Sequence, residues 1–512
     1  MFRSPKLFLR LGLLLLTCSA VQTAFSQNPP KKLPSADKIV DNYLKAVGGK
    51  KTVGALKDAT YEWIIELNNE PIGTARTQLK APASERLELT FGNGQIISAT
   101  NARSAWELGL DNRLRTLTGI ESAAAKLRAA FDSSRFINFK KANVLARVVS
   151  VGDVAWEPAY IVEFSTRSGA RFQYYFSVKT SLITKITSDT KKTRAAFEDY
   201  RAEQGIMEPH RVRMNFAGSG ELTLVLQTVK YNTGIDDKVF DPPASTESLD
   251  AAELLREVER NQDETENRVS EYSFKQTETD REITDKGELK KQTVKVYEIF
   301  PLPNREPVQK LLSENGVPLS PERAAKEDRR VQEEFEKAER EKQKDEKKVA
   351  QRRAERAKQD EEGTEISPFL KACEFVSPRR ETLAGRETIV FDFRPRAGFR
   401  PKTREESLVA KLVGVVWIDP IDKQVIRLEA RLAEGFKMGG GLLVSLKPGA
   451  ALVIEQTRMA QGVWLPRFAQ VNLSLKVLLF GGGDYNKTIE WSDYRHFSGD
   501  VKDYKIDVPA KP

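Results

Sequence analysis

Residues 198–210 read EDYRAEQGIMEPH, and residues 455–467 read EQTRMAQGVWLPR. The two segments align without a gap, with a Glu, an Arg, a Gln-Gly pair and a Pro at the same places in both. A Gln-Gly pair between extended segments favours a tight turn, and a Pro fixes the backbone that follows it. Each segment therefore predicts a strand, a turn and a second strand. Their likeness predicts that the chain contains one unit twice.

The flanking sequences agree with this alignment. Residues 172–186 and 415–428 each read as a strand, a polar turn and a second strand, and the segments after the motif alternate apolar and polar residues. Each half also begins with a helical pattern. Ser35 is expected to cap a helix that Gly48 ends, and Asp250 is expected to start another helix.

These patterns predict a mainly β fold of the α+β class, in two tandem domains. We place the first domain at residues 35–243 and the second at 248–512, each with covering helices on a curved antiparallel sheet or open β-barrel. Residues 322–362 contain fourteen acidic and fourteen basic residues and neither Gly nor Pro. Opposite charges three and four residues apart predict a single charged helix, inserted in the second domain.

The N-terminus predicts export. Residues 1–26 read as a signal peptide, with basic residues followed by a short apolar run and a cleavage site after Ser26, and residues 27–34 read as a linker. The expected location is the periplasm. As an alternative, residues 15–18 (LLTC) are similar to the lipobox of bacterial lipoproteins, which would make Cys18 the acylated N-terminus of an outer-membrane lipoprotein.

Composition argues against several function classes. The formal net charge is +9, and three of the positive charges lie in residues 1–26, so the mature chain carries only +6 and no nucleic-acid partner is expected. His210 and His496 are the two histidines of the sequence, and no metal-site or cofactor motif accompanies them. Asp419 and Asp422 could serve a hydrolase, but the residues between them favour a hairpin turn. We therefore predict a non-enzymatic protein without metal or cofactor.

One family shares these features. The N-terminal helix ADKIVDNYLKAVGG (36–49), the segment VVWIDPIDKQVIRL (415–428) and the following GVWLP (462–466) resemble the exported lipoprotein-sorting carriers of the LolA/LolB type. The resemblance covers residues 35–243 and 248–510 and excludes the charged segment. It implies an open β-barrel or curved sheet in each half, whose concave side holds acyl chains of lipoproteins or other lipids.

Large apolar residues at alternate strand positions are the candidates for such a concave face. They are Trp63, Ile65, Tyr174, Phe176, Trp417, Leu473 and Leu475. The alternative is that they are ordinary core residues, because any half-buried sheet needs this pattern. The function predicted is a carrier or binding protein for lipid, acyl chains or lipoproteins in the bacterial cell envelope. The alternative function is a structural or interaction protein with solid cores and no ligand.

A run of basic residues suggests a contact with an anionic membrane surface, because clustered cations attract lipid headgroups. The alternative is the solvated face of strands and their turn. The run consists of Arg379, Arg380, Arg386, Arg394, Arg396, Arg400, Lys402 and Arg404.

Overall fold

The computed structural model describes residues 33–496, apart from short gaps and one longer one. The gaps are 138, 140–143, 189, 191–192, 217–219, 246–250, 270, 285–287, 303–304, 339, 341–366, 439–443, 460–461 and 478–480. The signal peptide and most of the linker predicted from the sequence lie outside the described residues. The described residues from Ser35 onward form one compact unit.

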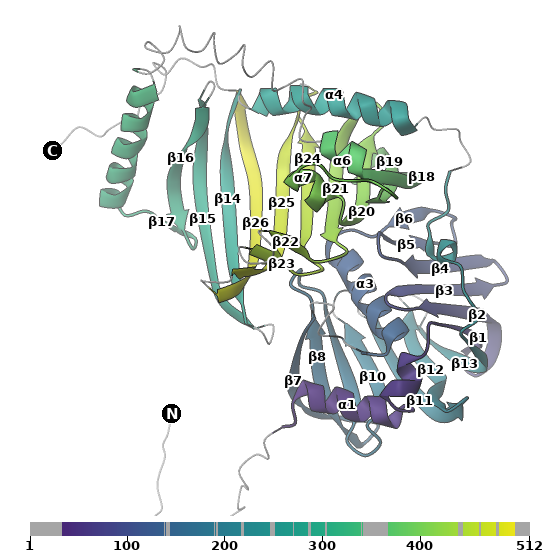
Figure 1. Ribbon diagram of the computed structural model, residues 1–512. Helices are drawn as coiled ribbons and strands as arrows, with labels where there is room; N and C mark the ends of the chain where they lie inside the picture. Colours follow the sequence, from purple (N-terminus) through teal and green to yellow (C-terminus); the bar gives the residue numbers. More distant parts are fainter. Residues whose placement is uncertain are drawn as a thin grey trace, which may run out of the picture. The chain divides into compact units, whose positions relative to one another are not determined.

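The first half forms an open antiparallel sheet of thirteen strands in the order β6-β5-β4-β3-β2-β1-β13-β12-β11-β10-β9-β8-β7 (Figure 1). The strands are β1 (Asp58–Leu67), β2 (Glu70–Lys80), β3 (Ser84–Phe91), β4 (Gly94–Thr100), β5 (Ala105–Leu108), β6 (Leu114–Thr116), β7 (Leu145–Val154), β8 (Glu157–Ser165), β9 (Arg171–Ser177), β10 (Ile183–Ser188), β11 (Thr193–Glu203), β12 (Ile206–Phe216) and β13 (Gly220–Tyr231).

The second half forms another open antiparallel sheet, with main order β17-β16-β15-β14-β26-β25-β24-β21-β20-β19-β18. A short hairpin, β22–β23, pairs with the end of β25. The strands are β14 (Tyr272–Ile283), β15 (Leu289–Leu302), β16 (Arg305–Glu314), β17 (Val317–Pro318), β18 (Cys373–Leu383), β19 (Arg386–Pro395), β20 (Leu412–Asp419), β21 (Gln424–Leu432), β22 (Phe436–Met438), β23 (Val444–Leu446), β24 (Ala451–Arg458), β25 (Trp464–Val477) and β26 (Gly481–His496).

The two sheets share one pattern of connections, although they differ in the number of strands before the crossover, β1–β6 in one and β14–β17 in the other. In each sheet the first strand lies in the middle, between the second strand and the last strand. The two matching motifs of the sequence form corresponding hairpins, β11–β12 and β24–β25. Gly205 and Gly462 have φ angles of 83° and 82° in the two turns, where glycine avoids backbone strain.

The helices are α1 (Ala36–Ala46), α2 (Lys50–Gly54), α3 (Gly119–Ser134), α4 (Ala251–Val269), α6 (Ser367–Ala372), α7 (Arg404–Val409) and the 3₁₀ turn η2 (Asp237–Phe240). Residues 321–338 are also helical. Ser35 caps α1 as predicted, since its side chain accepts a hydrogen bond from the Lys38 N–H. Gly48, just beyond α1, lies so close to the carbonyl oxygen of Gly205 that a Cβ would be 2.5 Å from it. The helix end therefore packs directly on the β11–β12 turn.

The α+β class is confirmed, because two large antiparallel sheets with a few helices account for the described residues. Neither sheet closes into a barrel. Most of the charged segment 322–362 lies outside the described residues, so the long inserted helix stays a prediction, as do the two domain boundaries. No helix in the described part of the chain is long and apolar enough to span a membrane.

Candidate functional site

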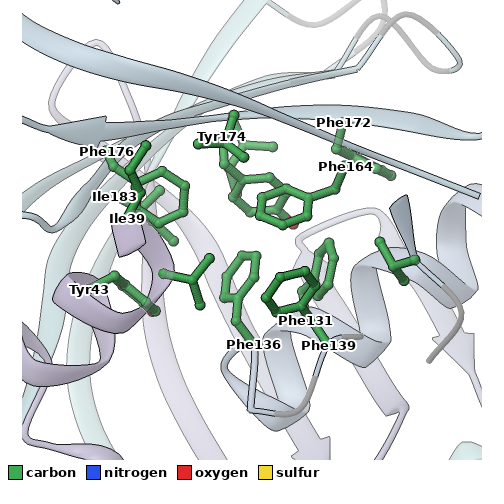
Figure 2. Packing of buried hydrophobic residues seen from close by; sticks show 14 of the residues in the cluster. Ile39, Tyr43, Phe131, Phe136, Phe139, Phe164, Phe172, Tyr174, Phe176 and Ile183 are labelled. Carbon is green, nitrogen blue, oxygen red and sulfur yellow. The ribbon is translucent and has the colours of Figure 1, made fainter. Parts of the chain in front are cut away.

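The concave interior of the first sheet is filled by aromatic rings. Figure 2 shows Phe164, Phe172, Tyr174 and Phe176 on the strands, facing rings from α1, α3 and the segment after α3. Tyr174 and Phe176 are fully buried. The rings meet at core distances, for example 4.4 Å between the centroids of Phe131 and Phe136. Two of the residues predicted to contact a ligand therefore pack against protein side chains.

Trp63 and Ile65 lie in a second cluster of the same sheet, formed by β1 and its neighbours. Both are buried. The Trp63 ring stacks on Tyr61 at 5.8 Å, and its Nε1–H donates to Thr77 Oγ1 at 3.1 Å. These contacts are also those of core residues, so the first half offers a filled interior at the four predicted positions.

Arg128 of α3 and Arg135, the residue that caps its C-terminal end, pair with strands on either side of β1. Arg128 donates to the Glu85 carboxylate of β3 at 2.8 Å, and Arg135 pairs with Glu208 of β12 at 2.5 Å. Tyr61 and Tyr231 donate to the same Glu208 carboxylate. Because a buried carboxylate requires such partners, the network fixes α3 in the concavity.

A small cavity lies beside the Glu85–Arg128 pair. Its volume is about 60 Å³, and its walls include Trp106, Leu117 and Phe172. Sites for small molecules commonly measure about 300–1,000 Å³. This cavity is therefore sized for water molecules rather than for an acyl chain.

Asp132 gives α3 a pH-dependent stability. Burial raises the pKa of Asp132 to about 7, and the nearby Glu85 carboxylate also raises it, against the lowering effect of Arg128 and Arg135. The folded state thus binds the proton more tightly than the unfolded chain does. The stabilisation is present at low pH and is lost as the pH rises through the interval from about 4 to about 7.

We expect Asp132→Asn to be more stable than the wild type by about 1–2 kcal/mol near pH 8 and equally stable near pH 4. The expected difference in stability is small because the Asp132 side chain is 33% exposed, so solvent screens its charge. Denaturant unfolding at both pH values measures it, with the exposed Asp153→Asn as the matched control. Parallel stability–pH curves for the wild type and Asp132→Asn would contradict this assignment.

The second sheet separates the remaining predicted residues. Across β20, β21, β24 and β25, the pairing places Trp417 on the same face as Arg427 and Glu455, whereas Val416 shares the opposite face with Leu473. Trp417 is 1% exposed and packs with Val390 and Val415. Trp417 and Leu473 therefore do not belong to one binding surface. The side chain of Leu475 lies outside the described residues.

Helices cover one side of the face that carries Leu473. Leu254 and Val258 of α4 pack on Phe391, Val416 and Ile418, which are at most 3% exposed. Phe369 of α6 and Val409 of α7 pack beside them on Phe393. Figure 1 shows α4 across one end of these strands and α6 and α7 over β20 and β21.

The same face continues over β24–β26 with lower burial. Cross-strand pairs lead from Val416 to Leu428 and on to Ile454 and Ala469. In the described part of the chain, no helix residue joins the side chains of this continuation in a hydrophobic cluster. We call it the open apolar face. Its residues, all half-buried, are Leu452, Ile454, Ala469, Val471, Leu473, Ile489 and Trp491.

Polar groups on β14 and β26 lie beside the open apolar face, and Lys487 is directly across from Val471 within it. Trp491 Nε1–H donates to Gln276 Oε1 at 2.9 Å, and Gln276 donates to Glu278 at 2.7 Å. Lys487 donates to the same Glu278 carboxylate at 2.7 Å. These polar groups therefore bond one another next to the apolar side chains of the face.

Asp419 and Asp422 occupy the β20–β21 turn, as the sequence predicts. Asp419 accepts hydrogen bonds from the N–H groups of Ile421 and Asp422 and pairs with Arg386. Asp422 pairs with Arg458 at 2.6 Å and accepts from Trp464. These hydrogen bonds hold the pKa of Asp422 below its usual value despite burial. Both carboxylates thus serve the turn and its ion pairs.

A buried ionic contact that was not predicted joins the two sheets. Arg379 is 1% exposed and donates to Asp392 at 3.0 Å, to Glu381 at 2.8 Å and to the Thr116 hydroxyl. Glu381 also accepts from the backbone N–H of Thr116, on the edge strand β6. Asp392 accepts from Ser104 at 2.7 Å. We predicted Arg379 as part of a surface run, and its burial corrects that prediction.

Comparisons with known proteins find weak resemblances to solved structures. No family model matches the sequence, and no curated protein matches it. Solved structures that it resembles include a LolA superfamily protein from Nitrosomonas europaea (14% identity, 41% of this chain, 99% of that chain, TM-score 0.29). Another is a lipoprotein-sorting protein domain from Vibrio parahaemolyticus (11% identity, 40% and 97% coverage, TM-score 0.28). A third is Pseudomonas aeruginosa MucB with MucA (8% identity, 90% and 99% coverage, TM-score 0.18). Values this low establish no shared function.

Proposed function

We propose that this chain is an exported, non-enzymatic binding protein for an acyl chain of a lipid or lipoprotein, and that the ligand lies on the open apolar face of the second sheet. The periplasm is its proposed location, because residues 1–26 read as a signal peptide. Acylation at Cys18 remains the alternative location signal, and it places the protein at the outer membrane.

One observation carries this proposal. Seven adjacent apolar side chains stay half-buried on a face whose continuation under α4 is almost fully buried. A contiguous apolar surface of this kind marks an interaction site in a folded protein. Each CH₂ group buried there contributes about 0.8 kcal/mol, so an acyl chain can bind with few polar contacts.

The first sheet has a different part in this proposal. Its interior is filled by the aromatic cluster around Phe131 and Tyr174, and the cavity beside it measures about 60 Å³. We assign the first half to stability and to support of the second half through the Arg379 contact. The filled interior also favours the second candidate function, a structural or interaction protein of the cell envelope that binds no lipid.

A pair of labelled variants tests the proposal. Val471 lies on the open apolar face, and the preceding residue, Gln470, lies on the opposite face of β25, with both half-buried. Each is replaced by Cys in the mature chain and labelled with an environment-sensitive fluorophore. Cys373 is buried, and burial raises its pKa to about 12. The label therefore reacts with the introduced thiol rather than with Cys373.

We expect palmitate to shift the emission of the label at residue 471 to the blue, with saturation at one ligand per chain, and to leave the label at residue 470 unchanged. The physical cause is displacement of water from the apolar face alone. Equal responses at the two labels would favour the interaction protein. The same conclusion would follow if neither label responded and the exported protein, purified without detergent, contained no lipid.

A further inference from the structure

The structure divides the basic run of the sequence into a structural part and an exposed part. Arg379 is buried among carboxylates. Arg380 pairs with Glu387 at 2.5 Å, and Arg386 pairs with Asp419 at 2.5 Å. Each of these three cations therefore forms an ion pair within the protein.

The exposed part runs from the end of β19 through the connection to the first residue of α7. Its five cations, all exposed, are Arg394, Arg396, Arg400, Lys402 and Arg404. Arg394 pairs with Glu374 at 3.0 Å. In the described part of the chain, no carboxylate forms an ion pair with Arg400, Lys402 or Arg404. We call residues 394–404 the basic loop.

The basic loop is held against α6 by its own backbone and by one arginine. The N–H of Arg396 donates to the carbonyl of Ala372 at 2.8 Å, and its guanidinium donates to the carbonyls of Lys371 and Cys373 at 3.0 and 2.9 Å. Gly398 has a φ of 75° in the turn that follows. The loop thus has a fixed base, from which the later cations project into solvent.

An aromatic residue interrupts the cations. Phe399 is half-buried, and it does not belong to the hydrophobic clusters described for the second sheet. A phenylalanine between arginines combines an apolar group with positive charge. That combination suits the boundary between headgroups and acyl chains of a bilayer.

We propose that the basic loop docks the protein on a bilayer surface that contains anionic phospholipid. The local charge of the sequence is positive, since Lys371 and the five loop cations outnumber the nearby acidic residues Glu374, Glu405 and Glu406. Anionic lipid attracts each well-placed cation at the surface. This docking is independent of the proposed acyl-chain site, because the residues of the two surfaces are separate.

The test is flotation of the mature chain with vesicles of phosphatidylglycerol and phosphatidylcholine, compared with pure phosphatidylcholine. The triple variant Arg400→Gln, Lys402→Gln, Arg404→Gln is expected to lose affinity for the anionic vesicles by on the order of a hundredfold. The reason is that each of the three replaced side chains loses its attraction to an anionic headgroup. Binding of the unchanged protein should weaken at high salt, because salt screens the charges.

A matched control removes the same net charge elsewhere. Lys50, Lys51 and Lys230 are exposed and lie outside the basic loop, so their triple replacement by Gln should leave vesicle binding nearly unchanged. Equal losses in the two triple variants, or absence of wild-type binding to anionic vesicles, would overturn the docking proposal. The palmitate response at residue 471 separates this failure from a failure of the proposed function.

Discussion

Arg379→Ala is expected to lower the free energy of unfolding by about 3–5 kcal/mol, because it removes the cation from a buried ion-pair network. Asp392 is fully buried and Glu381 is 8% exposed. Without the guanidinium, Glu381 loses its ion pair with Arg379, and Asp392 keeps its longer pair with Arg103 at 3.4 Å. Both carboxylates keep the cost of burial. The change also removes the hydrogen bonds from Arg379 to Thr116, which belongs to the other sheet.

The neighbouring residue provides the control. Arg380 is exposed and its ion pair with Glu387 lies at the surface, with side-chain exposures of 40% and 62%. Surface pairs of this kind contribute about 0–1 kcal/mol, so Arg380→Ala should leave stability nearly unchanged. Urea unfolding followed by tryptophan fluorescence compares the two variants. Equal midpoints would show that the contact between the sheets adds no stability.

Phe131→Ala is expected to cost about 3–5 kcal/mol, as large-to-small changes in a packed aromatic core do. Phe131 is 1% exposed, and its ring meets those of Phe136, Phe164 and Tyr174 at centroid distances of 4.4, 4.9 and 5.6 Å (Figure 2). Removal of the ring leaves an apolar cavity between α3 and the sheet. Neighbouring rings on the strands cannot collapse fully into it.

A matched control lies in the same half. Trp156 is 97% exposed at the β7–β8 turn, so Trp156→Ala removes a larger ring without opening a cavity, and its effect should stay within about 0.5 kcal/mol. Unfolding monitored by circular dichroism measures both variants. If Phe131→Ala cost less than 1 kcal/mol, the first interior would be loosely packed and would again be a candidate for acyl-chain binding.

Local sequence signals predicted the elements that depend on neighbouring residues. Ser35 and Gly48 marked the ends of α1, because caps act over a few residues. The Gln-Gly turns marked two hairpins for the same reason. The helix expected to start at Asp250 is present as α4, which begins at Ala251.

The candidate site could be predicted only in part. Alternation of apolar and polar residues shows which side chains share one face of a strand, but it does not show what covers that face. Tyr174 and Leu473 have the same strand pattern, yet α1 and α3 help to bury Tyr174, while Leu473 stays half-buried. Trp417 falls on the other face, and the β20–β21 pairing shifts register directly after it. The burial of Arg379 depends on Thr116, 263 residues away, and no local pattern reports such a contact.

The most direct test is the palmitate titration of the mature protein labelled at residue 471 or residue 470. Binding on the open apolar face predicts a saturable blue shift at residue 471, one palmitate per chain, and a constant signal at residue 470. A protein that leaves both labels unchanged at every palmitate concentration would contradict the acyl-chain site.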